Sequence, residues 1–172
     1  DDAVIAYPTD SMYALGTRLG NHDGAELIRR IRHLDDRHHF TLVCCDFAQL
    51  GQLVHLDNSA FRAIKSATPG PYTFILPATP EVPRRLAHPK KRSVGVRIPD
   101  DPVALAILRE LGEPLVSSSL LMPGHYWPIT EGWQIKEELD DVLDAVVDAG
   151  DRGSEPTTVV DWTDGAPEVV RE

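Results

Sequence analysis

The sequence has few of the features that mark membrane, secreted or disulfide-stabilised proteins. No apolar run approaches the ~20 residues that a transmembrane helix needs. Its two cysteines, Cys44 and Cys45, are adjacent, and disulfide geometry does not fit neighbouring residues. We therefore expect a reducing, cytoplasmic compartment and no membrane partner. The chain begins at Asp1 rather than at a methionine, so we expect its termini to be incomplete.

Several familiar catalytic motifs are missing as well. The sequence contains no G-x-x-x-x-G-K-[ST], G-x-G-x-x-G or G-x-S-x-G pattern, so no P-loop, dinucleotide fold or nucleophile elbow is supported. His38 and His39 lie near the cysteine pair, but the four residues do not match a known ligand spacing. A packed cysteine pair and surface imidazoles explain them more simply, and we expect no metal site there.

Charge is distributed unevenly along the 172 residues. The net charge is −10, from 17 basic and 27 acidic residues, which argues against a general nucleic-acid binder because phosphates repel an acidic surface. Residues 1–97 carry 13 basic and 10 acidic residues, a net of +3. Residues 98–172 carry 4 and 17, a net of −13. The first half therefore leaves room for one basic cavity of nucleotide size, although an aromatic content of 6% supplies few base-stacking platforms.

Strand and helix signals alternate, which predicts a single α/β domain over residues 1–172 with an open, twisted, mixed sheet covered by helices. Asp23 and Asp57 are candidate N-caps, Pro102 suits a first helical turn and Gly112 suits a helix end. We expect strands at 3–7, 40–45, 72–78, 93–99, 114–121, 144–148, 157–162 and 168–171. We expect helices at about 23–34, 57–67, 102–111 and 131–140, with a short basic helix after Pro83.

Three polar segments are candidates for chemistry. Thr9, Asp10 and Ser11 follow a predicted strand, where α/β sheets place ligands, although an Asx or ST turn explains them equally well. A basic cluster, Arg29, Arg30, Arg32, Arg37 and His38, suits a phosphate or a carboxylate, or else a solvated helix face. The serines at 117–119 end a strand and can donate to anionic oxygens, or can simply begin a loop.

The order of six segments makes these signals more specific. They are YPTDSMYALG, the basic helix, PGPYTFILPAT, SVGVRIPDDP, LGEPLVSSSL and PTTVVDWTDG. Together they resemble the YrdC family, and most closely its YciO-like branch, over nearly the whole chain. The resemblance implies an open twisted α/β sheet with a concave basic cavity. It also implies threonylcarbamoyl-AMP synthesis from ATP, L-threonine and bicarbonate, with Mg²⁺ accompanying the ATP, for modification of adenosine 37 in transfer RNA.

The resemblance also assigns roles to particular residues. Those implied for threonine are Thr9, Ser11, Arg97, Ser117 and Thr157, with Arg97 pairing with the carboxylate. Those implied for ATP are Arg32, Ser93, Ser119 and Arg171. No covalent nucleophile is required, no catalytic residue is assigned, and no tightly bound cofactor is expected.

Two positions depart from the family's pattern. Its K-x-R motif is Arg32-His33-Leu34 here, and its S-x-N motif is Ser119-Leu120-Leu121. Leucine cannot donate to a phosphate or help to hold Mg²⁺, so we expect weak synthase activity, with partial compensation by His38. Two alternatives therefore stay open. One is an RNA- or nucleotide-binding protein, of the kind that binds double-stranded RNA, without synthase activity. The other is a hydrolase or carbamoyl-transfer enzyme acting on a related adenylate.

Overall fold

The computed structural model describes residues 2–33, 40–120, 129–153 and 155–171, and these form one nine-stranded sheet. The strand order is β7-β1-β2-β6-β3-β5-β4-β8-β9. Three neighbouring pairs, β1–β7, β3–β5 and β4–β8, are parallel and the other pairs are antiparallel. The sheet is therefore mixed and open, as the sequence predicted.

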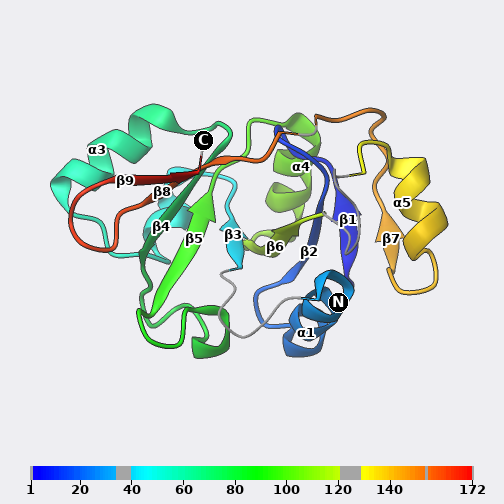
Figure 1. Cartoon of the computed structure of the whole chain (residues 1–172), viewed down its shortest axis with the longest axis horizontal. Coiled ribbons are helices and arrows are strands. Elements are labelled where there is room, and N and C mark those ends of the chain that lie inside the picture. Colours follow the sequence, from blue (N-terminus) through cyan, green and yellow to red (C-terminus); the bar gives the residue numbers. More distant parts are fainter. Residues whose placement is uncertain (1, 34–39, 121–128, 154, 172) are drawn as a thin grey trace.

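The strands and helices have the following bounds. The strands are β1 (Ile5–Tyr7), β2 (Ala14–Arg18), β3 (Thr41–Val43), β4 (Tyr72–Pro77), β5 (Ser93–Arg97), β6 (Leu115–Ser119), β7 (Ala145–Val146), β8 (Thr158–Asp161) and β9 (Glu168–Arg171). The helices are α1 (His22–Arg32), α2 (Phe47–Gly51), α3 (Asn58–Ala67), a 3₁₀ turn at Arg84–Leu86, α4 (Pro102–Leu111) and α5 (Gly132–Leu139). Figure 1 shows α3 near the β4–β8–β9 end of the sheet and α5 beside β7 at the other end.

The two faces of the sheet differ in what covers them. One face packs on the main core, to which α1 contributes Ala25 and Ile28. The opposite face carries a smaller apolar cluster in which α4 packs against Val43 and Leu115. Directly opposite residues in neighbouring strands point to the same face. The register pairs Thr41 with both Ser117 and Gly95, so much of the α4-bearing face next to this cluster is polar.

Helix ends follow local sequence signals, with one correction. Asp57 accepts a hydrogen bond from Ala60 N at 2.7 Å, which confirms it as the N-cap of α3. Pro102 lies in the first turn of α4, and Gly112 closes that helix with a φ of +75°. Asp23 does not cap α1, because the Asn21 side chain accepts the Gly24 N–H at 3.0 Å. Asp23 lies within the first turn of the helix instead, where its carboxylate interacts favourably with the positive end of the helix dipole.

Two elements lie outside the predicted set. Strand β2 has the sequence ALGTR, whose small residues give no alternating apolar signal, yet it pairs with both β1 and β6. Helix α2 has only five residues and is capped by Asp46, whose carboxylate accepts the Gln49 N–H at 2.8 Å. This cap follows closely on Val43 and Cys44, so β3 is shorter than the predicted strand at 40–45.

The cysteine and membrane predictions can also be compared with the structure. Cys44 and Cys45 are both free thiols, and burial is the main cause that raises the pKa of each. Across the described ranges, no helix has the length and apolar character that crossing a bilayer would require.

Candidate functional site

The loop between β1 and β2 is organised by one hydroxyl. Thr9 Oγ1 accepts the backbone N–H groups of Ser11 and Met12, both at 3.1 Å, and donates to the Met12 carbonyl at 2.6 Å. It also lies 3.0 Å from the Ser11 Oγ. Thr9 and Ser11 are both buried. The segment is therefore the turn that the sequence allowed, and this turn places two hydroxyls inside the protein at the end of a strand.

Arg97, at the end of β5, holds this loop. Its Nη1 donates to the Ser11 Oγ at 3.1 Å, and its Nη2 forms an ion pair with Asp10. The other Asp10 oxygen accepts the Asp100 N–H at 2.8 Å. Only 5% of Arg97 is exposed, yet its Nε has no hydrogen-bond partner among the described residues. We call Thr9, Asp10, Ser11 and Arg97 the Arg97 network.

The unpartnered Nε–H has a chemical meaning. A buried donor without an acceptor costs about 1–3 kcal/mol, so native proteins rarely leave one unsatisfied. A guanidinium offers its donors as a planar fork that matches a carboxylate. The Arg97 network therefore has the donor set for a carboxylate ligand.

Ser117 reaches the same face of the sheet from β6. Its Oγ donates to the Leu15 carbonyl at 3.0 Å, so the Tyr7 hydroxyl, 2.7 Å away, donates to Ser117. Burial raises the pKa of Tyr7 to about 12, with smaller opposing effects from Ser117 and the positive charge of Arg97. Tyr7 therefore stays protonated and fixes the Ser117 hydroxyl.

Thr157 approaches from the C-terminal part of the chain. Its hydroxyl lies 2.8 Å from that of Thr73 on β4, and both side chains are buried. A Cβ on Gly95 would lie 3.2 Å from the Thr73 Cγ2, so Thr73 packs beside β5 on the face that Arg97 occupies. The segment before Thr157 also touches the β1–β2 loop, because a Cβ on Gly153 would lie 2.8 Å from the Ser11 carbonyl oxygen.

The residues predicted to hold ATP are more widely spaced. Arg32, at the end of α1, donates to the Ser118 Oγ, and Ser118 points to the sheet face opposite to Ser117 and Ser119. Ser93 is fully buried on β5, two residues before Gly95. Arg171 lies on the outer strand β9, where its backbone pairs with Val159. Leu34, Arg37, His38, His39 and Leu121 lie outside the described residues.

Sequence reasoning missed one pairing and two further residues in this region. Asp10 was noted as a carboxylate, but its pairing with Arg97 had no local signal. Tyr7 was treated only as the end of an apolar strand, and its link to Ser117 depends on the antiparallel pairing of β2 with β1 and β6. Gly153 carries no motif, and only its close approach to Ser11 identifies it.

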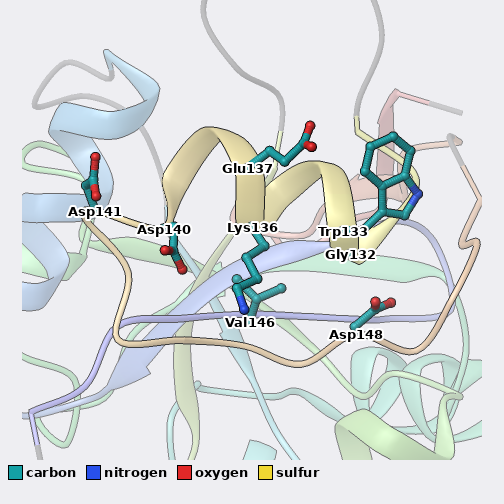
Figure 2. A pocket seen from close by; sticks show the side chains of 8 residues that line it. All are labelled: Gly132, Trp133, Lys136, Glu137, Asp140, Asp141, Val146 and Asp148. Atoms are coloured by element: carbon teal, nitrogen blue, oxygen red, sulfur yellow. The ribbon is translucent and has the colours of Figure 1, made fainter.

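A separate cavity of about 530 Å³ lies between α5 and the β7 edge (Figure 2). It is lined by Gly132, Trp133, Lys136, Glu137, Asp140, Asp141, Val146 and Asp148, and we call it the α5–β7 pocket. Figure 2 shows Lys136 reaching toward Val146. The lining has four carboxylates against one ammonium, so it disfavours a triphosphate. It contains none of the nine residues that the sequence predicted, and the predicted basic cavity stays a prediction.

The chain belongs to the Sua5/YciO/YrdC family, whose model, described as "Telomere recombination", matches residues 1–172. Within this family, the chain is 48% identical over 169 residues to the uncharacterized protein YciO of Escherichia coli K12. The aligned region covers 98% of this chain and 82% of that protein. It matches the crystal structure of E. coli YciO with a TM-score of 0.95, over 99% of this chain and 83% of the other. The family prediction and its YciO-like branch are confirmed.

Among more distant relatives, one is named for an activity and another was solved with a bound amino acid. The chain is 29% identical to the threonylcarbamoyl-AMP synthase of Bacillus subtilis, over 99% of this chain and 50% of that enzyme. P. abyssi Sua5 complexed with L-threonine matches with a TM-score of 0.89 and 25% identity, over 98% of this chain and 50% of the other. The chain thus spans about half the length of these two proteins.

Proposed function

We propose that this chain is a threonylcarbamoyl-AMP synthase-like enzyme that acts on L-threonine, bicarbonate and ATP. The observation that carries the proposal is the Arg97 network, in which a buried guanidinium keeps an Nε–H without a partner. The names of the two distant relatives support the same substrate class. The product would serve the modification of adenosine 37 in transfer RNA, in the cytoplasm.

In this proposal the threonine site is built around Arg97. The guanidinium receives the amino-acid carboxylate through charge-assisted hydrogen bonds. The remaining threonine contacts come from the hydroxyls of Ser11, Ser117 and Thr157. The Thr9 hydroxyl is already used within the turn, so Thr9 lies beside the ligand and holds Ser11 in place. Thr9 is fixed by the β1–β2 turn and Ser117 by Tyr7, so little side-chain entropy is lost when the ligand binds.

The reaction needs orientation more than covalent catalysis. The threonine amine combines with bicarbonate to give a carbamate and water. A carbamate oxygen then attacks the α-phosphorus of ATP, and pyrophosphate leaves. Polar and cationic groups near the phosphates offset the developing charge, a role we give to Arg32, Ser93, Ser119 and Arg171.

Magnesium would enter with the nucleotide. Mg²⁺ in such sites is usually held by substrate phosphates, water and one or two carboxylates rather than by a dedicated protein cage. The described part of the chain has no group of three or more His, Cys, Asp or Glu side chains suited to a metal. Phosphate and water ligands therefore fit the described residues better than a protein cluster does.

The rate should be lower than in relatives that keep both motifs. Leu34 and Leu121 stand where the family has Arg and Asn, so two polar contacts on the ATP side are lost. Each charge-assisted contact is worth roughly 1.5–3 kcal/mol, which together corresponds to a slowing of about 10²–10⁴-fold.

The test is incubation with ATP, L-threonine, bicarbonate and Mg²⁺, followed by assay of the adenylate and pyrophosphate. We expect turnover above that of Arg97→Ala, with Lys136→Ala in the α5–β7 pocket as the matched control that keeps full turnover. The double variant Leu34→Arg/Leu121→Asn should be faster than the natural sequence. Turnover no higher than that of Arg97→Ala, in both the natural chain and the double variant, would contradict the proposal. Net breakdown of added adenylate, or salt-sensitive binding of double-stranded RNA without synthesis, would support the alternatives.

A further inference from the structure

The Arg97 network contains two opposite charges, not one. Asp10 pairs with Arg97, and their side chains are 11% and 6% exposed. A buried guanidinium that is already neutralised attracts a plain carboxylate less strongly than a free one does. Any carboxylate bound to Arg97 would also lie close to the Asp10 carboxylate, and like charges that are poorly hydrated repel.

Asp10 is also fixed in place. One of its oxygens receives Arg97 Nη2 and the other receives the Asp100 N–H at 2.8 Å. The residues on either side, Thr9 and Ser11, belong to the hydrogen-bonded turn. Because both oxygens and the backbone are held, Asp10 remains beside Arg97 when a ligand arrives.

An ionised carboxyl group offers about four acceptor positions, and the described contacts occupy two of them. A cationic group on the ligand can use the remainder. An α-amino acid carries a carboxylate and an ammonium one carbon apart, so it can present an anion to Arg97 and a cation to Asp10 at the same time. A hydroxy acid of the same size supplies only the anion.

We propose that Asp10 is a specificity-determining residue that makes the site select zwitterionic α-amino acids over carboxylates without an ammonium group. This role of Asp10 rests on the proposed threonine site, and it explains why that site would accept an α-amino acid. Selectivity here has a repulsive part, against bare carboxylates, as well as an attractive part.

The experiment measures binding without nucleotide. Isothermal titration compares L-threonine with 3-hydroxybutyrate, which is threonine without its amino group, on the natural chain and on Asp10→Asn. Asparagine keeps the shape of the side chain and an acceptor for the Asp100 N–H but removes the charge. We expect threonine to bind at least about tenfold more tightly than 3-hydroxybutyrate to the natural chain, one ion pair being worth about that factor.

In Asp10→Asn, threonine should bind more weakly and 3-hydroxybutyrate more tightly, so that the ratio falls by at least about tenfold. Asp141→Asn, the same change in the α5–β7 pocket, should leave the ratio unchanged. A variant that weakens both ligands equally would show that Asp10 only positions Arg97, and this would overturn the inference. Equal affinities in the natural chain would overturn it without any variant.

The outcome is separable from that of the synthase assay. Discrimination that Asp10→Asn does not change, together with adenylate formation by the natural chain, removes only the role of Asp10. Discrimination that depends on Asp10, without any adenylate formation, removes only the synthase proposal and leaves an amino-acid site.

Discussion

The Arg97 network and the α5–β7 pocket use charge in opposite ways. In the network a single guanidinium is buried, and the side chains of Ser11 and Asp10 each accept a hydrogen bond from one of its two terminal nitrogens. In the pocket five charged side chains surround an open space, and Trp133 beside them is 51% exposed. Water and salt screen exposed charges, whereas buried charges act at a lower dielectric. The difference teaches that an open hollow with a mixed, exposed lining and a buried set of directed donors are different kinds of candidate, and our proposal uses the second.

The largest expected effect breaks the network at its centre. Arg97→Met keeps much of the side-chain length but removes the charge and all donors, so threonine affinity should fall by about 10²–10⁴-fold, for two charge-assisted hydrogen bonds of roughly 1.5–3 kcal/mol each. Lys136→Met makes the same change in the pocket and should leave the affinity unaltered. Calorimetric titration with L-threonine measures both.

Arg97→Met also leaves Asp10 buried without its partner, which costs about 3–5 kcal/mol of the free energy of unfolding. The double variant Asp10→Asn/Arg97→Met removes the unpaired charge and should regain most of that stability without regaining ligand binding. Recovery of binding in the double variant would show that Arg97 is not the carboxylate anchor.

A smaller effect on threonine affinity is expected at Gly153, whose backbone packs against Ser11 of the Arg97 network. A Cβ at Gly153 would lie 2.8 Å from the Ser11 carbonyl oxygen, so Gly153→Ala must move one backbone or the other. We expect threonine affinity to fall by about tenfold because Ser11 and its partner Arg97 shift, a loss near 1.4 kcal/mol.

Gly20→Ala is the matched control, because a Cβ there would meet nothing within 4 Å. It should bind threonine normally. If Gly153→Ala also binds normally, the segment before Thr157 does not support the loop, and the network is narrower than the structure indicates.

The next effect concerns stability. Tyr7→Phe removes the phenol that donates to Ser117, whose own bond to Leu15 remains. A lost hydrogen bond of this kind costs about 1 kcal/mol, which lowers Tm by about 2–4 °C in a chain of this size. Tyr72→Phe, at a 38% exposed tyrosine, should leave Tm nearly unchanged, and thermal unfolding followed by circular dichroism measures both.

The Tyr7→Phe variant also tests how the stability of the protein depends on pH in alkaline solution. Burial raises the pKa of Tyr7 to about 12, whereas an unfolded tyrosine ionises near pH 10. The unfolded chain therefore binds fewer protons between these values, and stability falls as pH rises through this window, by up to about 3 kcal/mol for two pKa units. Tyr7→Phe should show a shallower fall, and equal slopes would contradict the burial argument.

The sequence predicted those elements whose signals are local. Asp57, Pro102 and Gly112 act on their own helix ends, so they could be recognised in a single chain. Strand β2 could not be recognised in this way. It forms through its pairing with β1 and β6, and its small residues give no alternating apolar pattern. Asn21, and not the predicted Asp23, caps α1. Its side-chain amide also donates to the Thr17 hydroxyl at 2.9 Å, a contact that depends on where strand β2 places Thr17.

The candidate site likewise has a part that could be predicted from local motifs and a part that could not. Thr9, Ser11 and Arg97 could be nominated through the family's motifs, and the structure brings these three into contact. The pairing of Asp10 with Arg97 was not predictable, because it joins two segments that are 87 residues apart. Sequence alone thus nominated the cation, the hydroxyls and the Asp10 carboxylate, but it did not predict the pairing of Asp10 with Arg97 on which our selectivity proposal rests.

The smallest expected effect tests whether the pocket matters at all. Trp133 donates its indole N–H to Glu131 and is half exposed, so Trp133→Ala should change the free energy of unfolding by no more than about 0.5 kcal/mol, as is usual at surface positions. Threonine and ATP affinities should stay within twofold of the natural chain, measured by titration calorimetry. A clear loss of ATP affinity would place part of the nucleotide site beside α5. The proposed contrast, with ligands bound at the Arg97 network and not at the α5–β7 pocket, would then be wrong.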